Sequence, residues 1–166
     1  MRLTPAGAGL PLDAANTLGY QRCPMAVRKA KPSVSVADID RLIESAARIR
    51  EQAYAPYSRF RVGAAVLSSR GHIYLGCNVE NSSYGLSLCA ERAAIAAAVA
   101  AGDSQIIAAG IVTGSEKPTP PCGMCLQTLV EFGGTEAQVA LSTLRGVRQQ
   151  FSLGELMPHA FDRSFL

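Results

Sequence analysis

Residues 89–114 read CAERAAIAAAVAAGDSQIIAAGIVTG, and this stretch decides the fold class. Its first part, Cys89 to Ala101, is rich in alanine and therefore has near-maximal helix propensity, and Gly102 ends the helix. Its second part, Ile106 to Val112, is a continuous apolar run typical of a buried strand. Because alanine side chains are small, such a helix can lie close to a sheet. A helix followed by a buried strand predicts an α/β domain.

Upstream of this stretch, apolar residues recur at helical spacing from Ile39 to Ala53. Ser35 and Asp38 are placed like a capping box, and Pro56 marks the end of the pattern. These signals predict an amphipathic helix of about five turns.

The other elements complete a layered arrangement. Two short apolar runs, Val62 to Leu67 and His72 to Leu75, are joined by a tight polar turn and predict a hairpin. We expect a helix at Gly123–Phe132 and strands at Val139–Ser142 and Val147–Phe151. The predicted fold is a three-layer α/β/α domain with a central mixed sheet of about five strands and helices on both faces.

Length and charge exclude several classes of protein. The chain has 166 residues, of which 48% are hydrophobic and 17% charged, as in one globular domain and unlike a disordered chain. The first 35 residues carry five basic residues and one acidic residue, so the rest carries 11 basic and 12 acidic residues. Because the folded part has no basic excess, we expect no nucleic-acid partner.

The sequence predicts a leader followed by one folded domain, and it favours a location in the cytoplasm. Residues 1–34 are rich in Gly, Pro, Ala and Arg and predict a flexible leader, whereas residues 35–166 form the domain. The most apolar stretch, Ala93 to Ala101, is nine residues long, against about 20 for a membrane span, so we expect no membrane association. No secretory signal is visible, and five cysteines, an odd number, favour reduced thiols in the cytosol.

Three of the cysteines are spaced like the ligands of one metal ion. Cys122 and Cys125 form a Cys-x-x-Cys pair at the start of a predicted helix, and Cys89 opens another predicted helix 33 positions earlier. Helix N-termini favour thiolates, which are good zinc ligands. Three protein ligands leave the fourth tetrahedral position open for water, as in catalytic zinc sites. Taken alone, Cys-x-x-Cys also fits a redox dithiol or part of a structural zinc site.

Two charged residues follow Cys89 directly and extend this hypothesis. Glu91 shares the first helical turn with Cys89, which places it beside a metal ion and makes it a candidate proton shuttle. Arg92 is a candidate for offsetting the negative charge of three thiolates.

Several motifs together resemble the zinc-dependent cytidine deaminases, in particular the small homotetrameric enzymes that act on free nucleosides. The resemblance covers residues 35–161 and includes Cys89-Ala-Glu-Arg, Pro121-Cys-Gly-Met-Cys125 and Gly76-Cys-Asn-Val-Glu-Asn81. It further includes Tyr54-Ala-Pro-Tyr-Ser-x-Phe-x-Val-Gly-Ala-Ala65 and Leu153-Gly-Glu-Leu-Met-Pro-x-x-Phe161. It implies a cytidine deaminase-like fold, one Zn²⁺ per chain, and hydrolytic deamination of cytidine and 2′-deoxycytidine to the uridines with release of ammonia.

The resemblance also implies roles for residues in the substrate pocket. Phe60 would pack on the pyrimidine, and Asn78 and Glu80 would hold the ribose hydroxyls. The backbone at Ala90, together with the Glu91 side chain, would read the edge of the base. Tyr84 and Phe161 would be contributed to the pocket by neighbouring subunits, so the homotetramer would share its active sites.

One position departs from the family pattern and keeps other hypotheses open. Leu126 stands where the family usually has an arginine after the second cysteine of Cys-x-x-Cys. One alternative is a deaminase of the same fold that acts on a modified cytosine nucleoside, such as a blasticidin-type or an N4- or C5-substituted compound. A second is a non-catalytic zinc or redox module, and a third is polynucleotide editing.

Overall fold

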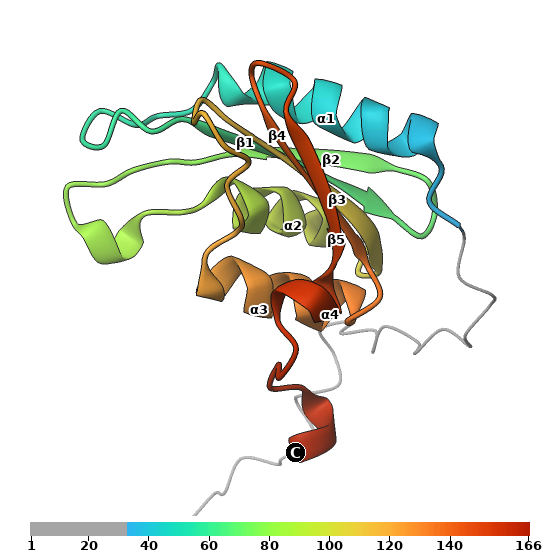
Figure 1. The fold of residues 1–166 in the computed structure, drawn as a ribbon. Coiled ribbons are helices and arrows are strands. Elements are labelled where there is room, and N and C mark those ends of the chain that lie inside the picture. Colours follow the sequence, from blue (N-terminus) through green and yellow to red (C-terminus); the bar gives the residue numbers. More distant parts are fainter. Residues whose placement is uncertain (1–32) are drawn as a thin grey trace, which may run out of the picture. The chain divides into compact units, whose positions relative to one another are not determined.

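The computed structural model describes residues 33–166, so the predicted leader at residues 1–34 lies outside the described part except for Ser33 and Val34. Figure 1 shows the helices and strands of this part of the chain. They are α1 (Val36–Arg50), β1 (Val62–Ser68), β2 (Ile73–Cys77), η2 (Tyr84–Leu86), α2 (Ala90–Ala100), β3 (Ile106–Thr113), α3 (Gly123–Gly133), β4 (Gln138–Thr143), β5 (Arg148–Ser152), α4 (Leu153–Leu156) and η3 (Arg163–Phe165).

The five strands form one mixed sheet in the order β2-β1-β3-β4-β5. β1 is antiparallel to both of its neighbours, β2 and β3, whereas β3 and β4 are parallel and β5 is antiparallel to β4. A parallel pair needs a crossover connection, and α3 supplies it between β3 and β4. The predicted five-stranded mixed sheet is confirmed.

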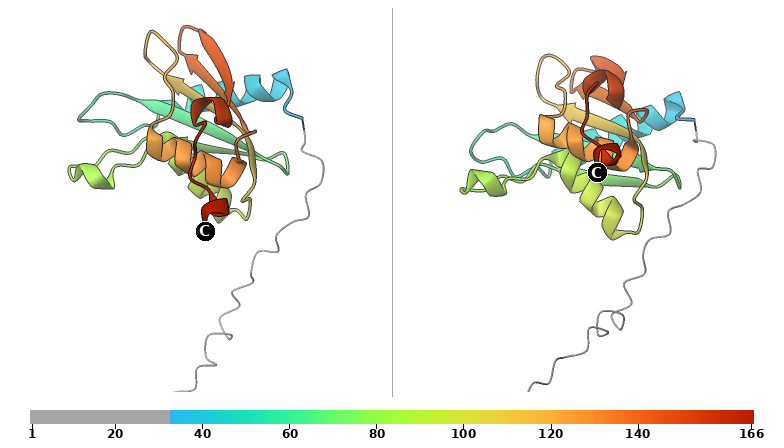
Figure 2. Two further views of the ribbon diagram at one scale, coloured as in Figure 1. Left: turned by 60° about the horizontal axis from the view of Figure 1, so that its bottom comes forward. Right: turned by 90° about the horizontal axis from the view of Figure 1, so that it is seen from below.

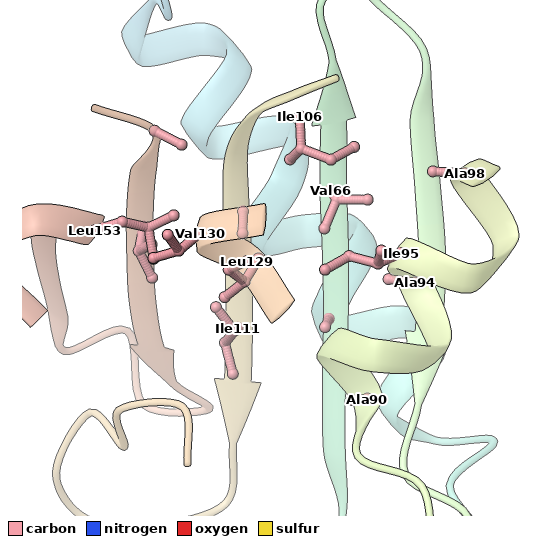
Figure 3. Packing of buried hydrophobic residues seen from close by; sticks show 14 of the residues in the cluster. Val66, Ala90, Ala94, Ile95, Ala98, Ile106, Ile111, Leu129, Val130 and Leu153 are labelled. Carbon is pink, nitrogen blue, oxygen red and sulfur yellow. The ribbon is translucent and has the colours of Figure 1, made fainter. Parts of the chain in front are cut away.

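Helices cover both faces of the sheet, and each face has its own hydrophobic core (Figures 1 and 2). Successive residues of a strand point to opposite faces, so Ala64 and Val66 of β1 pack with α2 and α3. Ala65 and Leu67 of the same strand pack with α1. Figure 3 shows Ile95 of α2 near Val66 on the α2 and α3 side. The three-layer α/β/α architecture is therefore confirmed.

The first helix begins where the sequence predicts and ends earlier. Ser35 is the N-cap, and its hydroxyl accepts from the amide of Asp38, whose carboxylate accepts in return from the amide and hydroxyl of Ser35. α1 ends at Arg50 and does not continue to Ala53. The reason is that the amide of Tyr54 donates to the carbonyl of Asn78, which draws the chain out of the helix and toward the sheet.

Gly76 of β2 allows α2 to approach the sheet closely. A Cβ at this position would lie 2.3 Å from both the carbonyl oxygen of Ala90 and the amide nitrogen of Ala94, which no real side chain permits. Ala90, Ala94 and Ala98 are completely buried on the facing side of α2. The close approach fixes the start of α2 against the sheet, and α2 carries part of the functional site.

A buried carboxylate ties the β1–β2 hairpin to the turn that follows α2. Asp103 accepts from the hydroxyls of Ser68 (2.7 Å) and Tyr74 (2.8 Å), and its Oδ2 lies 2.9 Å from Nδ1 of His72. Arg70 lies 3.2 Å from the other carboxylate oxygen. These contacts hold the far end of α2 in place.

Among residues 33–166, no helix is long and apolar enough to cross a membrane.

Candidate metal centre and active site

The site is built at the starts of two helices. Cys89 is the N-cap residue of α2 and Cys122 is the N-cap residue of α3, and neither side chain caps its helix by a hydrogen bond. Both sulfurs therefore remain available for other contacts, near backbone N–H groups that favour negative charge. Cys125 lies one turn into α3 and is fully buried. Both helices begin on the same side of the molecule (Figure 1).

The three sulfur atoms converge as the spacing predicts. The Sγ atoms of Cys89, Cys122 and Cys125 all lie within 4.8 Å of one another. The separation is 4.0 Å between Cys89 and Cys122 and 3.6 Å between Cys122 and Cys125. Tetrahedral zinc with Zn–S bonds of about 2.3 Å requires sulfur atoms about 3.8 Å apart. The cluster therefore fits a zinc ion held by three thiolates.

The protonation of the sulfurs supports the same conclusion. A hydrogen bond from Cys125 is the main cause that lowers the pKa of Cys89 from 9.0 to about 5, and Arg92 assists. The contact with Cys89 and burial together raise the pKa of Cys125. The lowered pKa of Cys89 favours its thiolate form near neutral pH. A bound dication would allow all three to ionise, since a coordinating thiol is deprotonated outright.

Arg92 lies in the first turn of α2, next to the sulfur of Cys89. Its Nη2 atom is 3.8 Å from the sulfur of Cys89 and donates to the carbonyl of Ser87 at 3.1 Å. Its Nε–H is buried and has no hydrogen-bond partner in the described part of the chain. The guanidinium is therefore positioned to offset thiolate charge, as we expect from the sequence.

Glu91 is a buried carboxyl group in the first turn of α2, with 5% of its surface exposed. Burial is the main cause that raises its pKa above the ordinary value of 4.5, and the negative charge of Cys89 acts in the same direction. A carboxyl group with a raised pKa can both accept and donate a proton near neutral pH. Glu91 also lines the cavity described next, where it can reach a bound molecule.

A cavity of about 590 Å³ opens beside Glu91 and the sulfurs of Cys89 and Cys122. This volume lies in the range of small-molecule sites. Five of the predicted substrate-binding residues line it: Phe60, Asn78, Glu80, Tyr84 and Ala90. The sixth, Phe161, is not among the lining residues of this chain. Its carbonyl accepts from the Gln127 side chain, and its ring stacks on Phe165.

Two polar groups that the resemblance places at the ribose also organise the wall of the cavity. The Asn78 side chain accepts from the amide of Val62 and donates to the carbonyl of Phe60, each at 2.8 Å. The Glu80 carboxylate accepts from the amides of Tyr57 (2.8 Å) and Ser58 (3.2 Å) and from the hydroxyl of Ser58. The hydrogen bond from Ser58 is the main cause that lowers the pKa of Glu80.

The sequence reasoning missed several hydroxyl groups that line the cavity. Ser58 belongs to the Tyr54–Ala65 motif, which does not single it out as a functional residue. Thr113 and Thr119 belong to none of the motifs. The Thr113 and Thr119 hydroxyls are 3.1 Å apart and brace the loop that leads to Cys122. Thr113 ends the buried strand β3, and this position at a strand end was the only signal available.

Comparisons with known proteins agree with this geometry. The family model for the cytidine and deoxycytidylate deaminase zinc-binding region matches residues 36–141. A cytidine deaminase from Halalkalibacterium halodurans is 44% identical over 124 residues, covering 75% of this chain and 94% of the relative. A cytidine deaminase from Sporosarcina psychrophila is 43% identical over 129 residues, covering 78% of this chain and 95% of the relative. The crystal structure of cytidine deaminase from Burkholderia pseudomallei superimposes with a TM-score of 0.71 at 45% identity, covering 74% of this chain and 98% of that one.

Proposed function

The chain belongs to the family of cytidine and deoxycytidylate deaminases that share this zinc-binding region, and from this premise we propose that it deaminates cytidine and 2′-deoxycytidine. The products are uridine and 2′-deoxyuridine, and ammonia is released. One observation carries the proposal: the buried carboxyl group of Glu91 lies beside three convergent sulfurs on the wall of a nucleoside-sized cavity. The protein is accordingly a zinc-dependent hydrolase, and we assign the activity to residues 35–166.

The residues of the site divide the chemical work. Cys89, Cys122 and Cys125 would hold one zinc ion, which when bound acts as a Lewis acid and makes water nucleophilic near neutral pH. Glu91 accepts a proton from the water that attacks C4 and passes it to N3 of the pyrimidine. Glu91 then moves the second water proton to the amino nitrogen on C4, which leaves as ammonia. Its raised pKa suits both steps.

The substrate is held by groups on two loops. We assign Phe60 to the face of the pyrimidine and the backbone at Ala90 to its edge. The lowered pKa of Glu80 keeps this carboxylate ionised at neutral pH, where it can accept a hydrogen bond from a ribose hydroxyl. Asn78 uses one of its two amide hydrogens on Phe60, which leaves the other for the sugar.

The charge of Glu80 favours a free nucleoside over a nucleotide. We propose that Glu80 accepts a hydrogen bond from a ribose hydroxyl. A phosphate on that hydroxyl would remove the donated hydrogen and place a negative phosphate next to the negative carboxylate. The described domain also has no basic excess that could hold a phosphate backbone. We therefore assign no nucleic-acid partner to the protein.

The proposed assembly is a homotetramer whose subunits share their active sites. Exposed apolar groups near the cavity support this proposal, because Tyr84 at the cavity edge has 77% of its surface exposed and Leu86 has 71%. Phe161 is also exposed and would reach the cavity of a neighbouring subunit. We place the enzyme in the cytoplasm, where reducing conditions keep the zinc-binding thiols free of disulfides.

A substrate panel tests the proposed function. Purified protein is incubated with cytidine, 2′-deoxycytidine, C5- and N4-substituted cytidines and a blasticidin-type nucleoside, and absorbance and ammonia release are followed. The proposal predicts that cytidine and 2′-deoxycytidine react fastest. Preference for a modified nucleoside would favour the alternative suggested by Leu126, and zinc binding without any deamination would favour a non-catalytic module.

A further inference from the structure

The loop between α1 and β1 carries Phe60 into the cavity in a constrained conformation. Arg59 has a φ of 58°, in the left-handed region that residues other than glycine seldom adopt. Such a conformation persists only where surrounding contacts determine it. The amide of Arg59 donates to the carbonyl of Ala55 at 3.1 Å, and side-chain contacts on its two neighbours, Ser58 and Phe60, hold the loop further.

Both backbone groups of Phe60 are bound by side chains. Its amide donates to the hydroxyl oxygen of Ser58 at 3.0 Å, and its carbonyl accepts from Nδ2 of Asn78 at 2.8 Å. The backbone on each side of the aromatic ring is therefore fixed. Phe60 as a whole remains 40% exposed and lines the cavity.

The Ser58 hydroxyl is at the same time bound to Glu80. The hydroxyl hydrogen is donated to Oε1 of Glu80. The other carboxylate oxygen, Oε2, accepts hydrogen bonds from the amides of Tyr57 and Ser58. A carboxylate offers about four acceptor positions, so three donors from this loop leave one for a substrate hydroxyl. The Ser58 hydroxyl thus donates its single hydrogen to Glu80 and accepts the amide hydrogen of Phe60 on one of its two lone pairs.

We propose that Ser58 is a positioning residue that couples the base-binding Phe60 to the sugar-binding Glu80. Through one hydroxyl group, the orientation of the carboxylate and the backbone of the aromatic residue depend on each other. The inference rests on the proposed function, because it assigns Phe60 and Glu80 to the two halves of a nucleoside. Ser58 itself does not take part in the chemical steps at C4.

Ser58 should therefore affect substrate binding more than turnover. Loss of a hydrogen bond to a charged group weakens binding about 10- to 150-fold. We expect Ser58→Ala to raise KM for cytidine within that range and to leave kcat and zinc content nearly unchanged. In a Glu80→Gln background the same substitution should add little, because the charge that Ser58 orients is already absent.

The test uses the holoenzyme and an isosteric pair of variants. Ser58→Thr retains the hydroxyl group and Ser58→Val replaces it with a methyl group, so a comparison of the two isolates the hydroxyl. We expect Thr to keep a KM near that of the wild type and Val to behave like Ala. Ser82→Ala, in the exposed loop nearby, is the matched control and should behave like the wild type.

Each outcome decides the inference. Equal KM values for Ser58→Thr and Ser58→Val would overturn it, as would fully additive effects of Ser58→Ala and Glu80→Gln on kcat/KM. A fall in kcat and melting temperature with no change in KM would show a purely structural serine and would also overturn it. Failure of the wild type to deaminate cytidine would instead reject the proposed function, so the two failures are distinguishable.

Discussion

At the scale of single residues, the chemistry depends on one carboxyl group and three sulfurs placed by helix starts. Cys89 and Cys122 occupy N-cap positions, and Glu91 follows one residue into α2. The same first turn that presents Cys89 to the sulfur cluster therefore buries Glu91, the proposed proton carrier, beside it. The raised pKa of Glu91 is a consequence of that burial and of its charged neighbour.

Replacement of Glu91 by glutamine tests its role as proton carrier. The amide cannot move a proton, so we expect kcat to fall by at least the 10²–10⁴-fold typical of general acid–base catalysis. Because burial raises the pKa of Glu91, its ionised form opposes folding as pH rises above about 4.5. The melting temperature of Glu91→Gln at pH 7 should accordingly be no lower than that of the wild type. Turnover near the wild-type rate, with zinc content unchanged, would contradict the assignment.

The sequence was sufficient to find the residues to which we assign the chemistry and insufficient to find the serine that we propose positions the substrate-binding groups. Cys89, Glu91 and Cys122 could be predicted because local helix starts present them, and spacing along the chain reports such local structure. The hydroxyl of Ser58 donates to Glu80, which lies 22 positions away along the chain. No local pattern encodes a contact of that kind, because it depends on how two loops meet after the sheet has formed.

At the scale of elements, the site depends on how closely α2 packs on the sheet. The boundaries of β1, β3 and β4 and of α2 and α3 follow hydrophobic patterns closely, since these elements are buried on a face of the sheet. The end of α1 does not, because the backbone pairing of Tyr54 with Asn78 competes with one more helical turn. Local propensity near Ala53 cannot report that competition.

The close approach at Gly76 predicts a large effect of a single methyl group. In Gly76→Ala the new Cβ would overlap backbone atoms of α2, so the helix must shift. We expect the free energy of unfolding to fall by about 1–3 kcal/mol and zinc affinity to fall as Cys89 moves. Gly85→Ala is the control, since a Cβ there meets no atom within 4 Å. Equal urea denaturation midpoints for the two variants would refute this packing argument.

The contacts of Asp103 predict a specific loss of stability in acid. Hydrogen bonds from Ser68, His72 and Tyr74, in that order, lower the pKa of Asp103 from 3.8 to about 2. A lowered pKa stabilises the fold above pH 3.8, and this contribution is lost as pH falls toward 2. The difference in melting temperature between wild type and Asp103→Asn should therefore be largest near neutral pH and shrink across this window. A difference that does not change with pH would contradict the prediction.

At the scale of the whole molecule, the sheet brings two loops, two helix starts and one cavity to the same side. The family relationship extends over nearly the full length of the relatives, 94% of one and 98% of another. Assembly is the remaining part of the proposal. The exposed Tyr84, which lines the cavity of its own chain, and the exposed Phe161, which does not, are the side chains proposed to contact neighbouring subunits.

Shared active sites predict that the C-terminal segment affects substrate binding without affecting the metal. Phe161→Ala should raise KM for cytidine while zinc content stays at one per chain, because the residue does not line the cavity of its own chain. Phe165→Ala serves as the control for loss of the Phe161–Phe165 stack. Light scattering should give a tetramer for all three proteins. An active monomer, or equal KM values for wild type and Phe161→Ala, would contradict the shared site.

The most direct test of the central claim is a zinc titration of metal-free protein, followed by the rate of cytidine deamination. The account places catalysis at one three-cysteine site, so activity should be absent without zinc, rise linearly and reach its maximum at one zinc per chain. Cys89→Ser should bind zinc weakly and stay inactive over the same range. Full deaminase activity in zinc-free protein, or activity in Cys89→Ser equal to that of the wild type, would contradict the account.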